Sequence, residues 1–106
     1  MARPEAKIRL DLNNPVFQGN LLTLQKPERH AALDALNKIR QLTWHQLYHD
    51  QGLRWEKITS IKPPKGIDAI CSLRITQARR ATAYRDGDFM RLLTIAPDHD
   101  ATYGHK

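Results

Sequence analysis

The sequence predicts an α+β domain in which two or three N-terminal helices pack on one face of an antiparallel, twisted sheet of about four to five strands. Arg85-Asp86-Gly87-Asp88 places an Asp-Gly turn between two runs of strand-forming residues, which is the strongest short-range signal for a hairpin. Apolar residues recur at helical spacing through residues 15–48, whereas strand-like runs dominate residues 53–95. Helices followed by a run of strands are typical of the α+β class.

The first segment predicts a strand and then a short helix. Ile8, Leu10 and Leu12 alternate with polar residues, which is the period of a half-buried strand. Asn14 is suited to cap a helix that begins at Pro15, because its side chain can accept hydrogen bonds from the free N–H groups of the first turn. The expected apolar face of this helix consists of Phe17, Leu21, Leu22 and Leu24.

The longest helix is expected from Lys26 to Gln41. Its apolar residues recur at helical spacing, and they are Ala32, Leu33, Leu36 and Ile39, followed by Leu42. Thr43 and Gln46 fit the capping-box pattern, which predicts a new helical turn through Tyr48 rather than one uninterrupted helix. Gly52 is expected to end that helix.

The second half of the chain predicts the remaining strands. Residues 53–58 resume the two-residue alternation and should form the second strand. The segment from Ile61 to Gly66 contains two prolines, which lack the N–H donors of a central strand, so it should be a connecting loop. Ala69–Thr76 should pair beside the hairpin and complete an antiparallel meander.

Length and composition indicate a single domain that spans residues 1–106. The chain is 41% hydrophobic and 26% charged, as in ordinary globular domains. It has no run of eighteen apolar residues and no apolar signal segment at its N-terminus, so we expect a cytoplasmic protein without a membrane partner. The single cysteine, Cys71, should be a small buried hydrophobe.

The charge of the chain favours a polyanionic partner. Seventeen basic and eleven acidic side chains give a net charge of +6 and a pI near 9.8. Residues 54–91 hold nine of the basic side chains and four of the acidic ones. Composition alone leaves two interpretations open, a nucleic-acid-binding surface and a merely solvated face.

The strand period brings several arginines to one face of the predicted sheet. If Leu73 faces the helices, Arg74 must face away, because neighbouring strand residues point to opposite sides. The register that buries alternate residues of the next two strands puts Arg80 and Arg91 on the same helix-free face. The parity of the last strand is left open, since both of its faces carry large apolar residues.

The residue types present suit RNA cleavage without a metal. The sequence has no Gly-rich phosphate loop, no HExxH, no zinc-ligand spacing and no Gly-x-Ser-x-Gly, so no metal or other cofactor is expected. Arginine holds phosphate bidentately, and His99 or Tyr103 could transfer protons. The 2′-hydroxyl of the RNA would then attack the neighbouring phosphorus while arginines stabilise the added negative charge.

Each of these residues also has a purely structural interpretation. Arg74 and Arg80 could form cross-strand ion pairs with aspartates. His99 could hydrogen-bond the chain end, and Tyr103 could be a docking aromatic. Glu56 could be a carboxylate base, although a surface salt bridge to a neighbouring basic residue is the commoner arrangement.

The pattern resembles the RelE/ParE family of toxins from bacterial type II toxin-antitoxin systems. The matching segments are Leu73-Arg74-Ile75, the strand from Arg80 to Tyr84-Arg85, Asp86-Gly87, the strand to Ile95, and finally His99 and Tyr103. The resemblance covers most of the chain, although the helical half matches only in kind. One extra residue lies between Arg80 and Tyr84.

The resemblance implies a ribosome-dependent mRNA endoribonuclease that inhibits translation. Arg74 and Arg80 would match the basic residues that meet the scissile phosphate, Tyr103 the C-terminal aromatic that orients a base or substrate, and His99 an acid or base. Lys62, Lys65 and Arg79 would bind the RNA backbone, although Arg79 is also interpretable as simply solvated. Arg91, on the helix-free face, is a further candidate for binding nucleic acid. The implied partners are a cognate antitoxin, the ribosome with its mRNA, and operator DNA through the antitoxin.

Two other functions remain open. One is a ParE-like, non-enzymatic inhibitor of gyrase on the same fold, and the other is a nucleic-acid-binding module without catalysis. The joint presence of Arg74, Arg80, His99 and Tyr103 favours the enzyme over ParE-like members, which lack an equivalent set. A binding module would need only the arginines.

Overall fold

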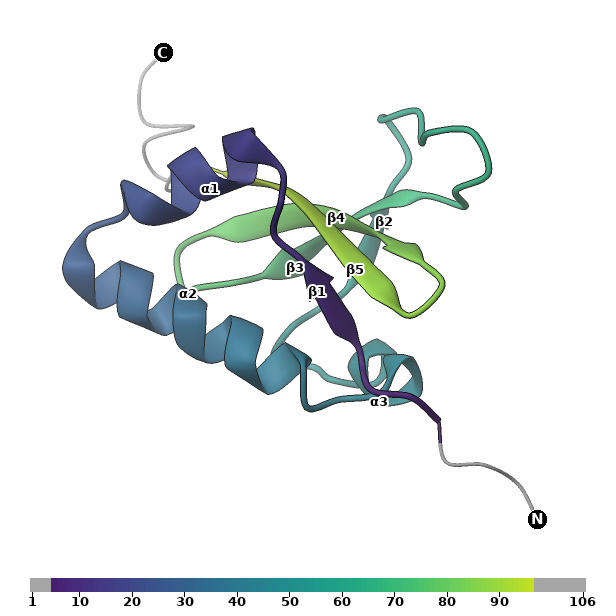
Figure 1. Ribbon diagram of the computed structural model, residues 1–106, viewed down its shortest axis with the longest axis horizontal. Coiled ribbons are helices and arrows are strands. Elements are labelled where there is room, and N and C mark those ends of the chain that lie inside the picture. Colours follow the sequence, from purple (N-terminus) through teal and green to yellow (C-terminus); the bar gives the residue numbers. More distant parts are fainter. Residues whose placement is uncertain (1–4, 97–106) are drawn as a thin grey trace.

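The computed structural model describes residues 5–96, within which three helices lie on one side of a five-stranded sheet (Figure 1). The elements in chain order are β1 (Arg9–Asp11), α1 (Pro15–Leu22), α2 (Lys26–Ile39), α3 (Trp44–Tyr48), β2 (Glu56–Ile58), β3 (Ile70–Arg74), β4 (Arg80–Asp86) and β5 (Phe89–Ile95). The strand order is β1-β5-β4-β3-β2. The predicted α+β class, with helices on one face of the sheet, is confirmed.

Strands β2 to β5 form the expected antiparallel meander. The β4–β5 hairpin turns at Gly87, whose φ of 63° lies in the left-handed region that glycine adopts without steric penalty. Strand β1 instead pairs with β5 in parallel, so the sheet is mixed at this edge. All three helices and strands β2 to β4 lie between β1 and β5 in the sequence, and local alternation does not reveal such a distant partner.

The helix starts follow the caps read from the sequence. The Asn14 side chain accepts a hydrogen bond from the Val16 N–H at 2.8 Å, and Pro15 opens α1. Thr43 and Gln46 form a capping box in which each side chain binds the other residue's backbone N–H. Helix α2 ends at Ile39, two residues before the predicted end at Gln41.

The core lies between the helices and the inner face of the sheet. Its fully buried large side chains include Phe17, Ile39, Trp44, Leu73 and Met90. Leu22, which was expected on the apolar face of α1, is 66% exposed, so that expectation is wrong. Leu24, just after the helix, is buried instead.

A β-bulge resolves the ambiguous parity of β5. The register shifts between Thr82 and Ala83, so that Thr82 faces Thr94 while Ala83 faces Leu92. Leu93 is thus the extra residue of the last strand. Leu92 and Ile95 can therefore both enter the core, and Leu93 stays half-exposed on the helix-free face.

Two features of the second strand region affect the site. Strand β2 has only three residues, so Leu53, Arg54 and Trp55, which were expected in it, lie in the preceding turn and loop. The following loop, which includes the two prolines, projects away from α1 and α2 in Figure 1.

None of the helices within residues 5–96 is long and apolar enough to cross a membrane.

Candidate phosphate-binding site

A group of arginines gathers at one end of the helix-free face, where β2, β3 and β4 meet. We call it the guanidinium cluster. It consists of the arginines Arg54, Arg74 and Arg80 together with the acidic residue beside them, Glu56. Arg74 and Arg80 stand directly opposite each other in the β3–β4 register. Glu56 on β2 stands opposite Ser72 on β3, on the same face. The sequence prediction that Arg74 and Arg80 share this face is confirmed.

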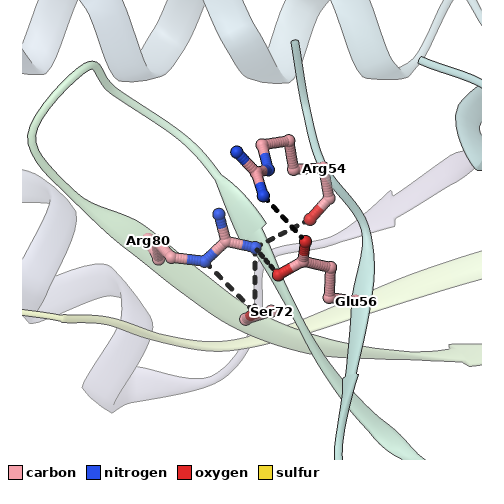
Figure 2. A network of polar contacts seen from close by, with 4 residues as sticks. All are labelled: Arg54, Glu56, Ser72 and Arg80. Carbon is pink, nitrogen blue, oxygen red and sulfur yellow. Dashed lines mark hydrogen bonds and ion pairs between the residues drawn. The ribbon is translucent and has the colours of Figure 1, made fainter. Parts of the chain in front are cut away.

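The Arg80 side chain is held in place by three neighbours, as Figure 2 shows. Its Nη2 donates to the Arg54 carbonyl oxygen at 2.7 Å and to Ser72 Oγ at 2.9 Å, and its Nε donates to the same Oγ at 3.2 Å. A weaker contact joins Nη2 to Glu56 Oε1 at 3.4 Å. The Nη1 group has no hydrogen-bond partner among residues 5–96, so both of its N–H groups are available to a ligand.

Arg54 adopts a left-handed backbone conformation, with φ of 51°. Such a conformation is uncommon for a residue with a Cβ atom and costs about 1 kcal/mol or more. The turn is fixed from both sides, because the Leu53 N–H donates to the Asp50 carboxylate and the Leu53 carbonyl accepts from the Arg74 N–H. As a result, the Arg54 carbonyl accepts a hydrogen bond from the Arg80 guanidinium, while the Arg54 side chain forms an ion pair with Glu56 at 3.3 Å.

The charges in the cluster are out of balance. Among the described residues, Glu56 is the carboxylate that pairs with Arg54 and Arg80, and none lies within ion-pair distance of Arg74. Burial lowers the pKa of the Arg80 guanidinium, the charges of Arg54 and Arg74 lower it further, and Glu56 opposes them. Arginine stays protonated in proteins all the same. Three guanidinium groups with one carboxylate therefore leave an excess of positive charge.

This arrangement suits an oxyanion with several acceptor oxygens. The guanidinium of Arg80 is pre-oriented and half-exposed, with 34% of its side chain accessible, and that of Arg74 is exposed. Planar guanidinium groups donate paired hydrogen bonds to phosphate oxygens. The cluster can therefore bind phosphate and stabilise additional negative charge on it.

Arg91 is separated from this cluster and is neutralised. It lies on the helix-free face as predicted, but its Nη1 contacts the Asp11 carboxylate at 2.5 Å and its Nε contacts Asp86 at 2.9 Å. The hydrogen bonds that Arg91 donates to the carboxylates of Asp86 and Asp11 raise the pKa of its guanidinium. Two carboxylates on one guanidinium leave no positive charge for an RNA backbone, which counts against its predicted role in nucleic-acid binding.

Arg79 also differs from expectation. It was interpretable as solvated, and this is wrong, because the side chain turns toward the helices and its Nε lies 2.7 Å from the Glu28 carboxylate of α2. The Arg79 Nε–H does not point at the carboxylate well enough to form a hydrogen bond, so the contact is an ion pair. Only 22% of the Arg79 side chain is exposed. Arg79 therefore ties the β3–β4 turn to α2, and this placement disfavours the predicted contact with RNA.

The remaining predicted site residues lie elsewhere. Lys62 and Lys65 are exposed in the loop between β2 and β3, as expected. His99 and Tyr103 lie outside the described residues, so their roles stay predictions. Within residues 5–96, no group of three or more histidine, cysteine or acidic side chains could hold a metal ion.

The sequence reasoning missed two members of the site, Arg54 and Ser72. Arg54 and Glu56 are two residues apart, so an extended segment would place them on the same side. That spacing was visible and would have brought both into the cluster. Ser72 has the same relation to Arg74 on β3, but a serine in a strand carries no distinctive signal.

No protein-family model, curated protein or solved structure matches this chain. The resemblance to RelE/ParE toxins thus stays a prediction, carried by residues of this sequence. The geometry of the guanidinium cluster is the independent observation on which a function can be argued.

Proposed function

We propose that this protein is a RelE/ParE-like toxin of a type II toxin-antitoxin system, acting as a metal-independent mRNA endoribonuclease on the ribosome. The observation that carries the proposal is the convergence of Arg54, Arg74 and Arg80 on the uncovered face of the sheet with only Glu56 among them within the described residues. A structural ion-pair network would have enough carboxylates to neutralise its arginines, as Arg91 has with Asp11 and Asp86.

The chemistry assigned to the cluster is an internal transesterification. The 2′-oxygen of the RNA attacks the adjacent phosphorus and loses its proton to a base, while the bond to the 5′-oxygen breaks and that oxygen gains a proton from an acid. The products are a 2′,3′-cyclic phosphate and a 5′-hydroxyl. Arg74 and the Nη1 of Arg80, which has no hydrogen-bond partner among residues 5–96, would donate to the non-bridging oxygens, whose negative charge grows in the transition state.

Glu56 is the described carboxylate positioned to accept the proton. It lies within 3.4 Å of the Arg80 guanidinium, so a phosphate bound by Arg80 would bring its neighbouring ribose close to this side chain. Its exposed fraction of 53% leaves it accessible to a substrate. His99, which the resemblance makes an acid or base candidate, lies outside the described residues.

The partners follow from this proposal. A toxin of this kind is held inactive by a cognate antitoxin, acts on mRNA in the ribosome in the cytoplasm, and reaches operator DNA through the antitoxin. The excess positive charge of the chain supports an RNA-containing target.

The deciding experiment is expression of the chain alone, with growth measured and transcript ends mapped. The wild type should arrest growth and produce new 5′-hydroxyl ends within coding regions. Arg80→Ala should abolish both the growth arrest and the new ends, because it removes a half-exposed guanidinium that stabilises the phosphate. Arg40→Ala removes the same charge from an exposed position at the end of α2 and should leave the arrest intact.

Three results would contradict the proposal or redirect it. Full arrest by a well-folded Arg80→Ala variant would remove the cluster from the mechanism. Arrest with unchanged transcripts and broken chromosomal DNA would indicate the gyrase inhibitor instead. RNA binding without arrest would indicate the non-catalytic module.

A further inference from the structure

A groove lies on the helix-free face beside the guanidinium cluster. Its walls are apolar, with Ile61, Pro63 and Pro64 from the β2–β3 loop on one side and Ile70 and Leu93 from the sheet on the other. Its volume is about 540 Å³, enough to hold one small aromatic group. Ile70 points to this face but is only 3% exposed, so it forms the inner end of the groove rather than an open surface.

The groove begins one strand repeat away from the arginines. Ile70 precedes Ser72 by two residues on β3, and Thr82 follows Arg80 by two residues on β4. Two residues along a strand span about 7 Å. A nucleotide whose phosphate binds at Arg80 can therefore place the adjacent part of the same ligand, one nucleotide unit away, in the groove.

The floor of the groove provides hydrogen-bonding groups. Thr82 Oγ1 and Thr94 Oγ1 lie 2.7 Å apart, on facing positions of β4 and β5. One hydroxyl hydrogen makes that bond, and the other is left to donate, together with unused lone pairs on both oxygens. An occupant with apolar faces and a polar edge matches this combination better than a purely aliphatic side chain does.

The charge around the groove matches an anionic ligand. Lys62 is one of the described lining residues, none of which carries a carboxylate, and the guanidinium cluster adjoins the sheet side. A single-stranded nucleotide has an aromatic base with a polar edge, joined to a phosphate. Leu93 and the prolines of the loop can pack against the base, while the hydroxyls of Thr82 and Thr94 hydrogen-bond with its polar edge.

We propose that this groove is a nucleobase subsite, so that a single-stranded RNA binds with one base between the β2–β3 loop and Leu93 and with the adjacent phosphate on the guanidinium cluster. The proposal rests on the proposed function, since it uses the same arginines, and it adds that the protein selects base-bearing chains over bare phosphodiester. Pro63 and Pro64 stiffen the loop, so the subsite is formed before the ligand arrives.

The test compares two short RNAs that differ in one base. A tetranucleotide with 2′-O-methyl groups cannot be cleaved, and a matched tetranucleotide lacks the base at one internal position. Titration followed by NMR or anisotropy should give the full ligand about 10-fold higher affinity. Leu93→Ser should bring that ratio close to one and leave the affinity for the base-deficient ligand unchanged, because Leu93 is half-exposed and outside the core.

Matched variants separate the two proposals. Ile61→Ser, in an exposed loop position, should reduce the ratio as Leu93→Ser does, whereas Leu22→Ser on the outer side of α1 should not. Arg80→Ala should weaken both ligands equally and preserve the ratio. If the wild type binds both ligands equally while Arg80→Ala weakens both, the subsite is overturned and the phosphate site stands.

Two further outcomes are decisive. If Arg80→Ala changes neither affinity, the phosphate site of the proposed function fails, whatever the groove does. If the base makes no difference but an acidic peptide with apolar side chains binds in a manner that depends on Leu93, the groove is a protein-docking surface and the nucleobase proposal is wrong.

Discussion

The guanidinium cluster and the ion pairs around Arg91 lie on the same face of one sheet, yet they have opposite charge balances. Within the described residues, Arg54 and Arg80 share the carboxylate of Glu56, and Arg74 pairs with none. Arg91 alone has two carboxylates, Asp11 and Asp86. The comparison teaches that exposure on the correct face does not make an arginine available to a ligand, because its carboxylate neighbours decide that.

Removing the carboxylate of the guanidinium cluster should have the largest effect. Glu56→Gln should lower RNA cleavage by about 100-fold if Glu56 accepts the 2′-hydroxyl proton. The same change should raise affinity for uncleavable RNA several-fold, since it removes the negative charge nearest the phosphate. Single-turnover cleavage and binding titration measure the two effects. If Glu56→Gln raises the cleavage rate together with the affinity, Glu56 is not the base and acts only as an ion-pair partner.

Deleting one arginine from each region should separate binding from stability. Arg80→Ala should weaken binding of a short RNA by about 10-fold or more at low salt, because it removes a charge-assisted phosphate contact. Arg91→Ala should change that affinity by less than about two-fold, but it should lower the melting temperature, since Asp11 and Asp86 would then lie beside each other without a cation. Equal losses of affinity in the two variants would mean that both regions contact RNA.

The smallest effect concerns acid stability at Asp11. The N–H of Asn13 and the guanidinium of Arg91 lower the pKa of the Asp11 carboxyl. A lowered folded-state pKa contributes stability that is present above the unfolded value near 3.8 and is lost as pH falls through the folded value. Denaturant unfolding at pH 7 should show the wild type more stable than Asp11→Asn by up to about 1 kcal/mol.

That difference should shrink below about pH 4. Glu5→Gln is a matched control, because Glu5 is an exposed carboxylate with no ion pair among residues 5–96. A difference between wild type and Asp11→Asn that stays constant down to pH 2.5 would show that the charge of Asp11 does not stabilise the fold.

Local patterns predicted the parts of the fold that depend on neighbours in sequence. Asn14, Thr43 and Gly87 act within a few residues of themselves, so their caps and turn could be read directly. The parallel partner of β1 could not be read, because it joins Arg9 to Phe89 across the whole helical layer. The bulge beside Thr82 was also hidden, although the two apolar faces of β5 were a sign of it.

The candidate site was predictable to the same extent. Strand alternation placed Arg74 and Arg80 on the helix-free face, and the register confirmed it. The neutralisation of Arg91 could not be foreseen, since Asp11 is 80 residues away in sequence. The spacing of Arg54 and Glu56 was visible, but the left-handed backbone that brings the Arg54 carbonyl to Arg80 leaves no mark in strand alternation.

The left-handed backbone at Arg54 has a consequence for engineering. Glycine at this position would relieve the steric conflict and, on backbone preference alone, would make the protein more resistant to heat. A thermostabilisation campaign would therefore tend to select against Arg54 and discard a cation of the site in the process. At this one position, a change that raises thermal stability lowers the affinity for an anion.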